Sequence, residues 1–309
     1  MAKNKTLIVI AGPTAIGKTA LAITMARHFN TEIISADSRQ FFREMSIGTA
    51  KPHADELAAA KHHFIDSHTI TTLFSTGDFE KQALEVLDEI FTRHDLAIMV
   101  GGSGLYLDAV TKGFDELPDT DMEIRNQLNL LFETEGLEPI KAQLEVADPE
   151  YYAKVDQANT QRLIRGLEFF LSTGKKVSAF LTNSKKQRPF NIIKIGLNME
   201  RSLLYERINH RVDLMLQEGL LAEVESLQAF RELNALKTVG YAELFDYLDG
   251  TITYDIAVEK IKQNTRRFAK RQLTWFRRDE QIHWFSPDQS DTIINFVADS
   301  INKTNKLPL

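Results

Sequence analysis

The stretch VIAGPTAIGKTAL, Val9 to Leu21, joins a short β-branched run to a glycine-containing turn and then to residues with helical spacing. It matches G-x-x-x-x-G-K-[ST], a pattern that holds phosphates when it lies between a strand and a helix. Backbone N–H groups and the helix dipole of such a loop point at phosphate oxygens. Lys18 would place a positive charge between phosphates, and the Thr19 hydroxyl would ligate Mg²⁺. We expect phosphates to bind at Gly12, Pro13, Thr14, Ala15, Ile16, Gly17, Lys18 and Thr19.

The segments around this loop predict an α/β fold. TLIVIAG, TEIISAD and DLAIMVGG are short apolar runs, and the first two flank GKTALAITMARHF, which has helical spacing. Strand, helix and strand at this spacing indicate a parallel sheet with right-handed crossovers. The expected fold class is therefore α/β, a P-loop-type parallel sheet flanked by helices, with residues 1–112 as its first part.

From residue 113 the composition changes. The chain is polar, helical in pattern and poor in strands as far as residue 190, after which FNIIKIGLNM again has the pattern of a strand and QIHWF that of a late strand. We interpret residues 113–190 as an all-helical insertion domain. Residues 191–309 would then complete the core and carry basic helices near the carboxyl terminus.

Composition limits the classes of protein to consider. The chain has 309 residues, 43% hydrophobic and 26% charged, which suits an ordinary globular protein. Cysteine is absent, which excludes a disulfide framework and a thiolate metal site and suits a cytoplasmic protein. No run approaches membrane-spanning length, so we expect no membrane partner. The formal charge of −6 argues mildly against nucleic acid, although binding depends on where positive charge lies.

A carboxylate and a hydroxyl follow two of the predicted strands. Asp37 follows IIS, and Ser103 lies in GGSGLY after LAIMV. Ligands of parallel sheets bind beyond the carboxyl ends of the strands, so Asp37 would face the phosphate loop and act as a general base or orient an attacking group. The alternative for Asp37 is a cap or turn aspartate. Ser103 fits either a contact to a leaving-group oxygen or a tight structural turn.

Positive charge gathers on one predicted helix of this acidic chain. Residues 260–278, KIKQNTRRFAKRQLTWFRR, contain eight basic residues and no acid. Helical spacing puts Ile261, Phe268, Ala269 and Phe276 on an apolar stripe and almost all the basic residues on the opposite face. Such a ridge suits a phosphate backbone. The alternative is a solvated face paired with acids elsewhere.

Smaller clusters have open interpretations. Arg162 and Arg165 lie three apart on a predicted helix and would contact a nucleic acid, phosphates or Glu168. Arg207 and Arg211 lie four apart and would form a fork that clamps a diphosphate. KHHFIDSH, with His62, His63, Asp66 and His68, is a weak candidate for a metal site, because adjacent histidines do not share a face.

Seven segments together resemble one family. GPTAIGKTALA, ISADSRQFF, MSIGTAKP, VGGSGLYLDA, QRLIRGLE, TVGYAEL and AKRQLTWFR resemble, in order, the motifs of bacterial tRNA dimethylallyltransferases, also called tRNA isopentenyltransferases. The resemblance extends from about residue 6 to 285. The combination of DSxQ, IGTAKP and KRQxxW is far more specific than the phosphate loop alone.

The resemblance implies a reaction and its residues. Dimethylallyl diphosphate would lose pyrophosphate, and its five-carbon group would go to N6 of the adenosine 3′ of the anticodon in a tRNA anticodon stem-loop. The phosphate loop would hold the diphosphate, with Mg²⁺ at Thr19. Catalysis would rest on Lys18, Asp37, Ser103 and Arg211, with Asp37 accepting the N6 proton. The protein would act as a monomer.

The resemblance also implies contacts with tRNA in four segments and at two further positions. They are Asp37, Ser38, Arg39, Gln40, Ser103, Arg125, Gln161, Arg162, Leu163, Ile164, Arg165, Lys237, Thr238, Val239, Gly240, Tyr241, Lys270, Arg271, Gln272, Trp275 and Arg277. The sequence departs from the family pattern at Arg39, Phe42 and Ala242.

Three other functions share some of these features. A P-loop kinase for a small metabolite would have the loop and Asp37 but would need neither a basic helix nor a large helical insertion. A prenyltransferase for free adenine nucleotides would have the same fold and donor, but the basic helix and QRLIR favour tRNA. A non-catalytic RNA-binding protein would not need Lys18, Thr19 and Asp37 together.

Overall fold

The computed structural model describes residues 5–115, 117–181 and 186–304. The ends assigned to the core, residues 1–4 and 305–309, lie outside them. The chain divides into two compact units, Met1–Lys112 with Gln187–Leu309, and Gly113–Lys186. Each unit has its own apolar core. None of the helices in the described residues combines the length and the apolar character that a membrane crossing requires.

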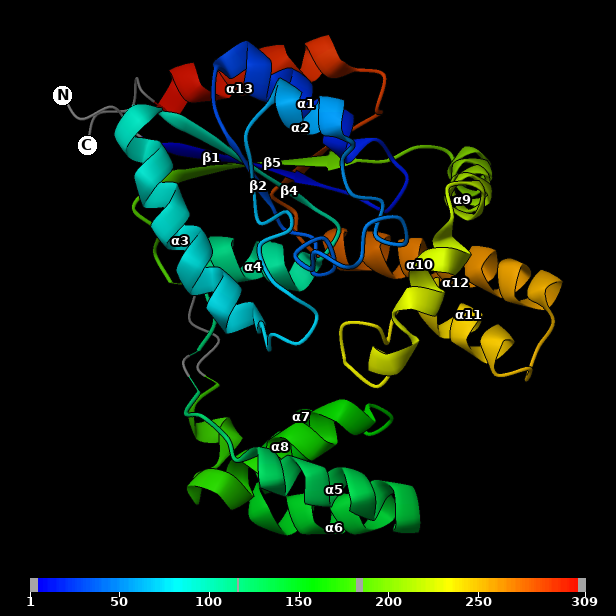
Figure 1. The fold of residues 1–309 in the computed structure, drawn as a ribbon. Coiled ribbons are helices and arrows are strands. Elements are labelled where there is room, and N and C mark those ends of the chain that lie inside the picture. The colour runs from blue at the N-terminus through cyan, green and yellow to red at the C-terminus, as the bar shows by residue number, and fades with distance from the viewer. Residues whose placement is uncertain (1–4, 116, 182–185, 305–309) are drawn as a thin grey trace. The chain divides into compact units, whose positions relative to one another are not determined.

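The larger unit is built on a parallel sheet (Figure 1). Within the described residues six strands pair in the order β3-β2-β4-β1-β5-β6, which confirms the parallel sheet expected from the sequence. They are β1 (Thr6–Ala11), β2 (Ile33–Ser35), β3 (His62–His63), β4 (Leu96–Gly101), β5 (Asn191–Leu197) and β6 (Ile282–Phe285). The central strand β1 pairs with β4 and β5, so the phosphate loop that follows it emerges in the middle of the sheet.

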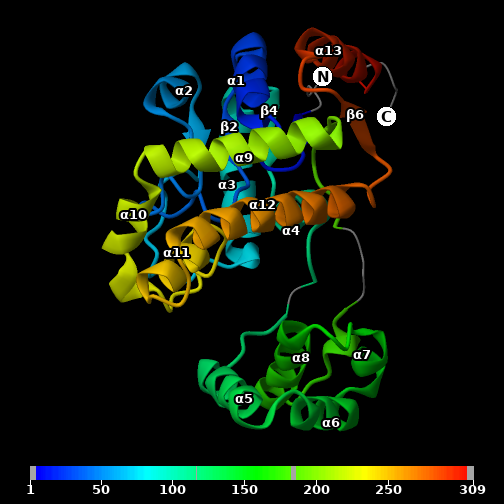
Figure 2. The same cartoon turned by 90° about the vertical axis from the view of Figure 1, so that its right-hand side faces the viewer.

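Helices cover both faces of this sheet. Alternate residues of β1 point to opposite faces, and both sets are buried, as in other parallel sheets. Figure 1 shows α1 (Lys18–Phe29) and α13 (Ser290–Thr304) over one face, with α3 (Thr76–Arg93) and α4 (Gly104–Lys112) over the other. The short α2 (Ala54–Ala59) lies beside α1, and β6 comes forward in Figure 2.

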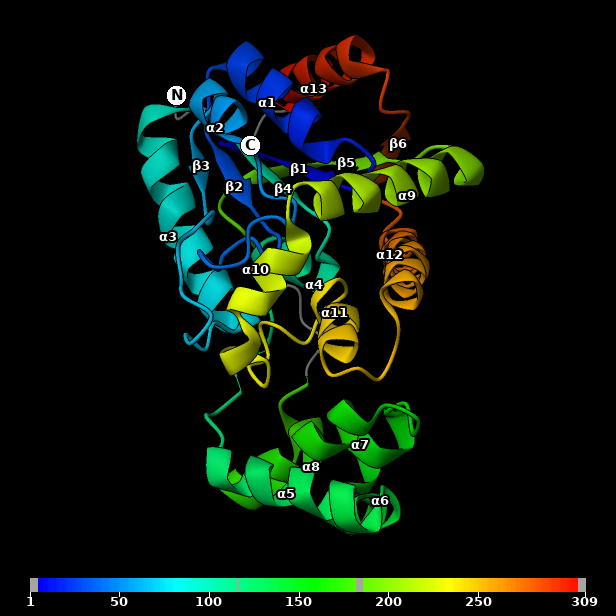
Figure 3. The ribbon, with the colours of Figure 1, turned by 45° about the vertical axis from the view of Figure 1, so that its right-hand side comes forward.

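Besides the apolar clusters on the two faces of the sheet, helices from the second half of the chain form another one. They are α9 (Arg201–Gln217), α10 (Leu220–Ser226), α11 (Tyr241–Leu248) and α12 (Tyr254–Phe276), with the 3₁₀ helix η2 (Gln228–Phe230) (Figure 3). Figure 2 shows α9 and α12 side by side. Phe42, Met45 and Ile70 from loops beyond the sheet pack into the same cluster. The cluster therefore joins these helices to the loops that follow the strands.

The smaller unit is helical within the described residues, as expected for the insertion. It contains α5 (Met122–Glu135), α6 (Glu138–Ala147), α7 (Pro149–Lys154), α8 (Thr160–Thr173) and the 3₁₀ helix η1 (Val177–Ala179). Ile140, Leu144 and Leu163 are fully buried in its core. The buried Asp148 accepts hydrogen bonds from the Tyr151 and Ser178 N–H groups, which caps α7 and anchors η1.

The helix that carries the basic ridge differs from its prediction in two ways. It begins at Tyr254, six residues before the predicted start, because the Thr253 hydroxyl caps its first turn by accepting from the Ile256 N–H at 3.4 Å. Phe268, placed on the apolar stripe, is instead 38% exposed. The buried stripe runs through Ile261, Ala269 and Phe276.

Glu32, which precedes β2, is surrounded by basic side chains. Its carboxylate contacts Lys61 at 3.0 Å, His63 at 2.7 Å and Arg93 at 2.8 Å. Burial tends to raise its pKa, but these hydrogen bonds outweigh that effect and lower the pKa of Glu32 from 4.5 to about 2. The carboxylate therefore ties β2 and β3 to the end of α3 at the amino-terminal edge of the sheet.

Glu32→Gln should destabilise the fold in a pH-dependent way. Because the folded pKa lies below the unfolded value, the ion pairs stabilise the protein fully above pH 4.5, and this stability is lost as the pH falls toward 2. The variant should lose up to ~3 kcal/mol of unfolding free energy at pH 6, and the gap should narrow by ~1 kcal/mol at pH 3.5. Urea unfolding at both pH values measures this. Glu85→Gln, an exposed change on α3, is the control, and equal effects of both variants at pH 6 would contradict the prediction.

Candidate active site

The phosphate loop lies between β1 and α1, as the sequence predicts. Gly12, Ala15 and Gly17 have positive φ angles, which turns the chain sharply at this point. The Lys18 ammonium donates to the Pro13 carbonyl at 2.8 Å and so folds back over the loop. The loop lines a cavity of about 600 Å³ together with the 46–53 segment and α9. Its volume falls within the usual range of small-molecule sites.

Two arginines from α9 reach this cavity. Arg207 and Arg211 both line it, and they lie one helical turn apart on the same face of α9. A Cβ atom at Gly17 would lie 3.7 Å from the Arg207 guanidinium. Arg211 donates to the Thr14 hydroxyl at 3.3 Å. The arginine fork inferred from the spacing of these residues therefore lies against the phosphate loop.

The pKa of Lys18 reflects its burial and the charged side chains near it. Burial lowers its pKa to about 8, Asp37 opposes this shift, and Arg211 adds to it. Burial likewise lowers the pKa of Arg211, against the attraction of Asp37. An anionic ligand between these cations would relieve their repulsion.

Asp37 and Ser103 lie at the carboxyl ends of β2 and β4, on neighbouring strands. The Arg39 N–H donates to one Asp37 carboxylate oxygen at 3.0 Å, so the turn role considered for Asp37 is present. Asp37 is also near enough to Lys18 and Arg211 to affect the pKa of each. Ser103 accepts from the Ser38 N–H at 3.2 Å, which holds the turns after β2 and β4 together.

Gln272 of α12 makes a connection that the sequence did not reveal. Its side chain is buried, accepts from the Thr14 N–H at 2.8 Å and donates to the Gly102 carbonyl at 2.9 Å. A Cβ atom at Gly102 would lie 2.3 Å from the Gln272 amide nitrogen and 3.6 Å from the Lys18 ammonium. A side chain at position 102 would therefore displace the Gln272 amide from this turn. In this structure the side chain of Gln272, which the resemblance places on tRNA, links the phosphate loop to that turn.

The structure places the other predicted tRNA residues of the larger unit in several environments. Gln40 donates to the Thr49 and Ala50 carbonyls at 3.1 and 3.0 Å. Burial lowers the pKa of Arg39, which lies near Tyr106 and Asp37. Trp275 donates to Asp108 at 3.1 Å.

An open groove is lined by Lys237, Thr238 and Val239, whereas Tyr241 is fully buried. Gly240 precedes α11 as its N-cap.

Three exposed basic residues on α12 and at its carboxyl end have no acidic partners in the described chain. Lys270, Arg271 and Arg277 are exposed, and in the described parts of the chain no carboxylate forms an ion pair with them. Lys262 instead pairs with Asp213 of α9 at 2.7 Å. The alternative of a ridge neutralised by neighbouring acids therefore does not describe these three residues.

The predicted tRNA residues of the smaller unit divide into three groups. Arg125 and Arg165 both contact the fully buried Glu168, at 2.8 and 3.2 Å. Leu163 and Ile164 are buried in the helical core. Gln161 and Arg162 are exposed on the first turn of α8. The side chains of Gln161, Arg162, Arg125 and Arg165 are accessible enough to contact RNA. Those of Leu163 and Ile164 are buried and therefore cannot.

The sequence suggests two places for a metal ion, Thr19 and the KHHFIDSH segment. No group of three His, Asp or Glu residues suited to a metal occurs in the described residues, and in KHHFIDSH His63 instead binds Glu32. Thr19 lines the cavity, and its hydroxyl has no hydrogen-bond partner among the described residues. Mg²⁺ commonly combines few protein ligands with substrate phosphates and water. The hydroxyl therefore fits that use.

The sheet order, the phosphate loop and the two arginines beside it define a P-loop α/β protein. The sequence model of the IPP transferase family matches residues 40–279. The tRNA dimethylallyltransferase of Christiangramia forsetii is 54% identical over 297 residues, covering 96% of this chain and 98% of that protein. The chain belongs to the IPP transferase family.

Solved structures agree with this assignment. The full-length tRNA isopentenylpyrophosphate transferase from Bacillus halodurans matches with a TM-score of 0.73 and 38% identity, covering 98% of both chains. A eukaryotic dimethylallyltransferase acting on tRNA matches with a TM-score of 0.80 and 27% identity, covering 99% of this chain and 81% of that one.

Binding of dimethylallyl diphosphate should be linked to protonation of Lys18. The anion favours the charged ammonium, so it raises the lowered pKa of Lys18. Affinity should fall by up to about tenfold per pH unit above pH 8, and binding there should take up a proton. Calorimetry at pH 8.5 in buffers of different ionisation enthalpy measures that proton.

Lys18→Arg separates this effect from titration of the ligand. An arginine stays charged over this range, so the variant should bind without the extra proton uptake, whatever its absolute affinity. Lys81→Arg, an exposed change on α3, should behave as the wild type. Equal proton uptake by wild type and Lys18→Arg would contradict the prediction.

Proposed function

We propose that the protein transfers a dimethylallyl group from dimethylallyl diphosphate to N6 of the adenosine adjacent to the 3′ side of the anticodon in tRNA, releasing pyrophosphate. The observation that carries the proposal is the convergence of Lys18, Arg207 and Arg211 on one cavity with Asp37 near them. The cations suit a diphosphate leaving group, and the carboxylate suits an acceptor that loses a proton. Family membership supplies the prenyl donor and the tRNA acceptor.

The transfer breaks the bond between C1 of the donor and its diphosphate oxygen and forms a bond from C1 to N6. Negative charge grows on the leaving pyrophosphate in the transition state, where Lys18, Arg211 and the loop N–H groups stabilise it. Mg²⁺ held at Thr19 would neutralise part of the same charge. Ser103 would add a hydroxyl at the turn after β4.

Asp37 receives the proton that N6 loses as the new bond forms. One of its oxygens accepts from the Arg39 N–H, which fixes the carboxylate in position. The adenosine reaches it by leaving the anticodon-loop stack, as single-stranded RNA permits. The base thus acts on the attacking amine, and the cations act on the leaving group.

The tRNA would lie along the exposed basic residues of α12. Lys270, Arg271 and Arg277 are free of acidic partners in the described chain, so their charge is available to phosphates. Exposed Arg162 and Gln161 of the smaller unit would add contacts. A small-metabolite kinase makes no use of such a ridge.

A panel of acceptors tests the proposed function. Carbon-labelled dimethylallyl diphosphate and Mg²⁺ are supplied with an unmodified tRNA that has adenosine 3′ of the anticodon, the same tRNA with guanosine there, or AMP. Label should enter only the first tRNA. Label on AMP alone would assign the protein to the nucleotide prenyltransferases. A folded protein that labels none of the three would contradict the proposal.

Asp37→Asn should lower turnover by at least ~100-fold, because the amide cannot accept the N6 proton but still accepts from the Arg39 N–H. Its tRNA affinity should stay within about threefold of the wild type. The amide has nearly the size of the carboxylate and keeps one hydrogen-bond acceptor. Single-turnover transfer and filter binding measure the two quantities. Asp88→Asn, exposed on α3, is the control. Near-normal turnover would remove Asp37 as the base.

Lys270→Ala with Arg271→Ala should weaken tRNA binding by about tenfold or more at 0.1 M salt and leave dimethylallyl diphosphate binding unchanged. Removal of two phosphate contacts should also reduce the slope of log affinity against log salt by about 1.5. A salt series of binding isotherms measures the slope, with Lys81→Ala as a control. An unchanged tRNA affinity would reject the ridge as the RNA surface.

A further inference from the structure

The loop at residues 46–48 is held by a single carboxylate from a different element. Glu223 of α10 accepts hydrogen bonds from the N–H groups of Ser46, Ile47 and Gly48, at 2.9, 2.8 and 3.0 Å. It also accepts from the Tyr241 hydroxyl at 2.6 Å. A carboxylate that accepts several charge-assisted hydrogen bonds fixes its donors more firmly than neutral acceptors would.

Tyr241 helps to hold the Glu223 carboxylate in place. Its side chain is fully buried, and burial and the nearby Glu223 raise its pKa, so the hydroxyl remains a donor. A Cβ atom at Gly48 would lie 2.5 Å from the Tyr241 ring. Glycine is therefore required at 48 for the loop to reach both the ring and the Glu223 carboxylate.

Further along the same loop, Ala50 lines the cavity that also contains the phosphate loop. Ala50 has a φ of 48°, a left-handed conformation that costs an alanine roughly 1 kcal/mol and is therefore kept by its surroundings. Its carbonyl accepts from Gln40 at 3.0 Å and from Arg211 at 3.5 Å. The loop thus presents an acceptor to an arginine of the diphosphate fork.

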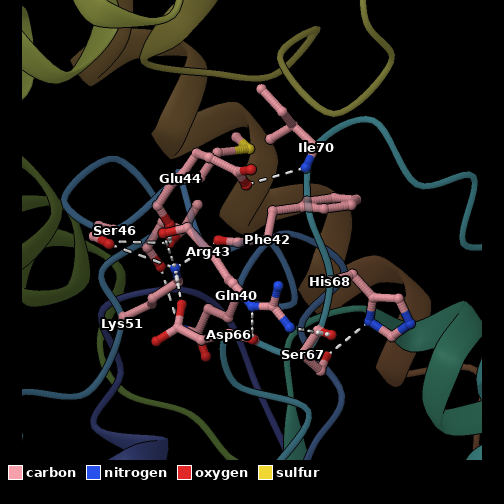
Figure 4. Close-up of polar contacts among 12 residues, drawn as sticks. Gln40, Phe42, Arg43, Glu44, Ser46, Lys51, Asp66, Ser67, His68 and Ile70 are labelled. Carbon is pink, nitrogen blue, oxygen red and sulfur yellow. Dashed lines mark hydrogen bonds and ion pairs between the residues drawn. The ribbon is translucent and has the colours of Figure 1, made fainter.

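Lys51, the next residue, lines the cavity and holds the loop through its ammonium. Figure 4 shows its ammonium directed at the backbone near Phe42 and at Asp66. It donates to the Phe42 carbonyl at 2.5 Å and to the Arg43 carbonyl at 3.2 Å, and it pairs with Asp66. The side chain of Lys51 is 7% exposed, and its ammonium interacts with these partners.

We propose that Glu223 is a positioning residue for the diphosphate site: by holding the 46–48 N–H groups, it sets the Ala50 carbonyl and through it the orientation of Arg211. The proposal rests on the proposed function, because it takes the ligand of Arg211 to be the diphosphate. Glu223 does not line the cavity. It acts through the 46–51 loop, and its removal should therefore affect binding of the diphosphate and not binding of tRNA.

Inorganic pyrophosphate and hydrogen exchange test this without turnover. In Glu223→Ala, amides of the 46–51 loop should exchange at least about tenfold faster, and the pyrophosphate dissociation constant should rise about tenfold. Glu223→Gln keeps one acceptor oxygen, and Tyr241→Phe removes one donor to Glu223, so both should show smaller changes in the same direction. Affinity for tRNA should stay within about twofold in both Glu223 variants. Glu225→Gln, exposed on the same helix, should match the wild type.

The outcomes separate positioning from a structural role. Faster exchange with an unchanged pyrophosphate dissociation constant would overturn the proposal, and so would unchanged exchange. If Glu223→Ala does not fold, the same comparison in Tyr241→Phe decides, because that change keeps the ring over Gly48. A wild-type protein that binds no pyrophosphate would contradict the proposed function itself, and the role of Glu223 would fall with it.

Discussion

The side chain of Gln272 links the parts on which the site depends. Its amide joins the Thr14 N–H of the phosphate loop to the Gly102 carbonyl after β4. The helix that carries it, α12, contributes side chains to the apolar clusters on both faces of the sheet. The loop after β1 and the turn after β4 are adjacent because their strands pair, but pairing alone does not set their separation. A buried amide with both ends satisfied does set it, because loss of either partner would leave a polar group unpaired.

Charge is distributed unevenly over this acidic chain, and the distribution matches two polyanionic ligands. One cluster, Lys18 with Arg207 and Arg211, surrounds a cavity in which burial depresses the pKa of Lys18 and Arg211. The other is the exposed face of α12, which has no acidic partners at Lys270, Arg271 or Arg277 in the described chain. Because α12 also carries Gln272, one helix contributes to the geometry of the donor site and to the surface proposed for RNA.

What could be predicted from the sequence is what local patterns determine. Hydrophobic periodicity gave the parallel sheet and a helical segment after residue 112, and the spacing of Arg207 and Arg211 gave the fork, since residues four apart share a helix face. Contacts between distant segments could not be read in this way. Gln272 looked like a surface residue of a basic motif, and Glu223 lies in LLAEVES, a stretch with no distinguishing pattern.

Burial also reversed some expectations. Phe268 fits the apolar stripe by angle, yet it is exposed because the neighbouring elements cover the side of α12 that carries Ala269 and Gln272. The sequence left a nucleic acid, phosphates and Glu168 as alternative partners of Arg165, and the structure pairs both Arg165 and Arg125 with the fully buried Glu168. A buried carboxylate needs such partners, and sequence periodicity does not show which arginines supply them.

The most direct test of the account follows both halves of the donor in one reaction. Dimethylallyl diphosphate labelled in its carbon chain and in both phosphorus atoms is mixed with excess protein, Mg²⁺ and unmodified tRNA, and the products are separated. The account predicts carbon label in the tRNA and an equal amount of phosphorus label in free pyrophosphate, because the phosphate loop holds a leaving group. Phosphorus label in the tRNA, or release of single phosphate without carbon transfer, would contradict it.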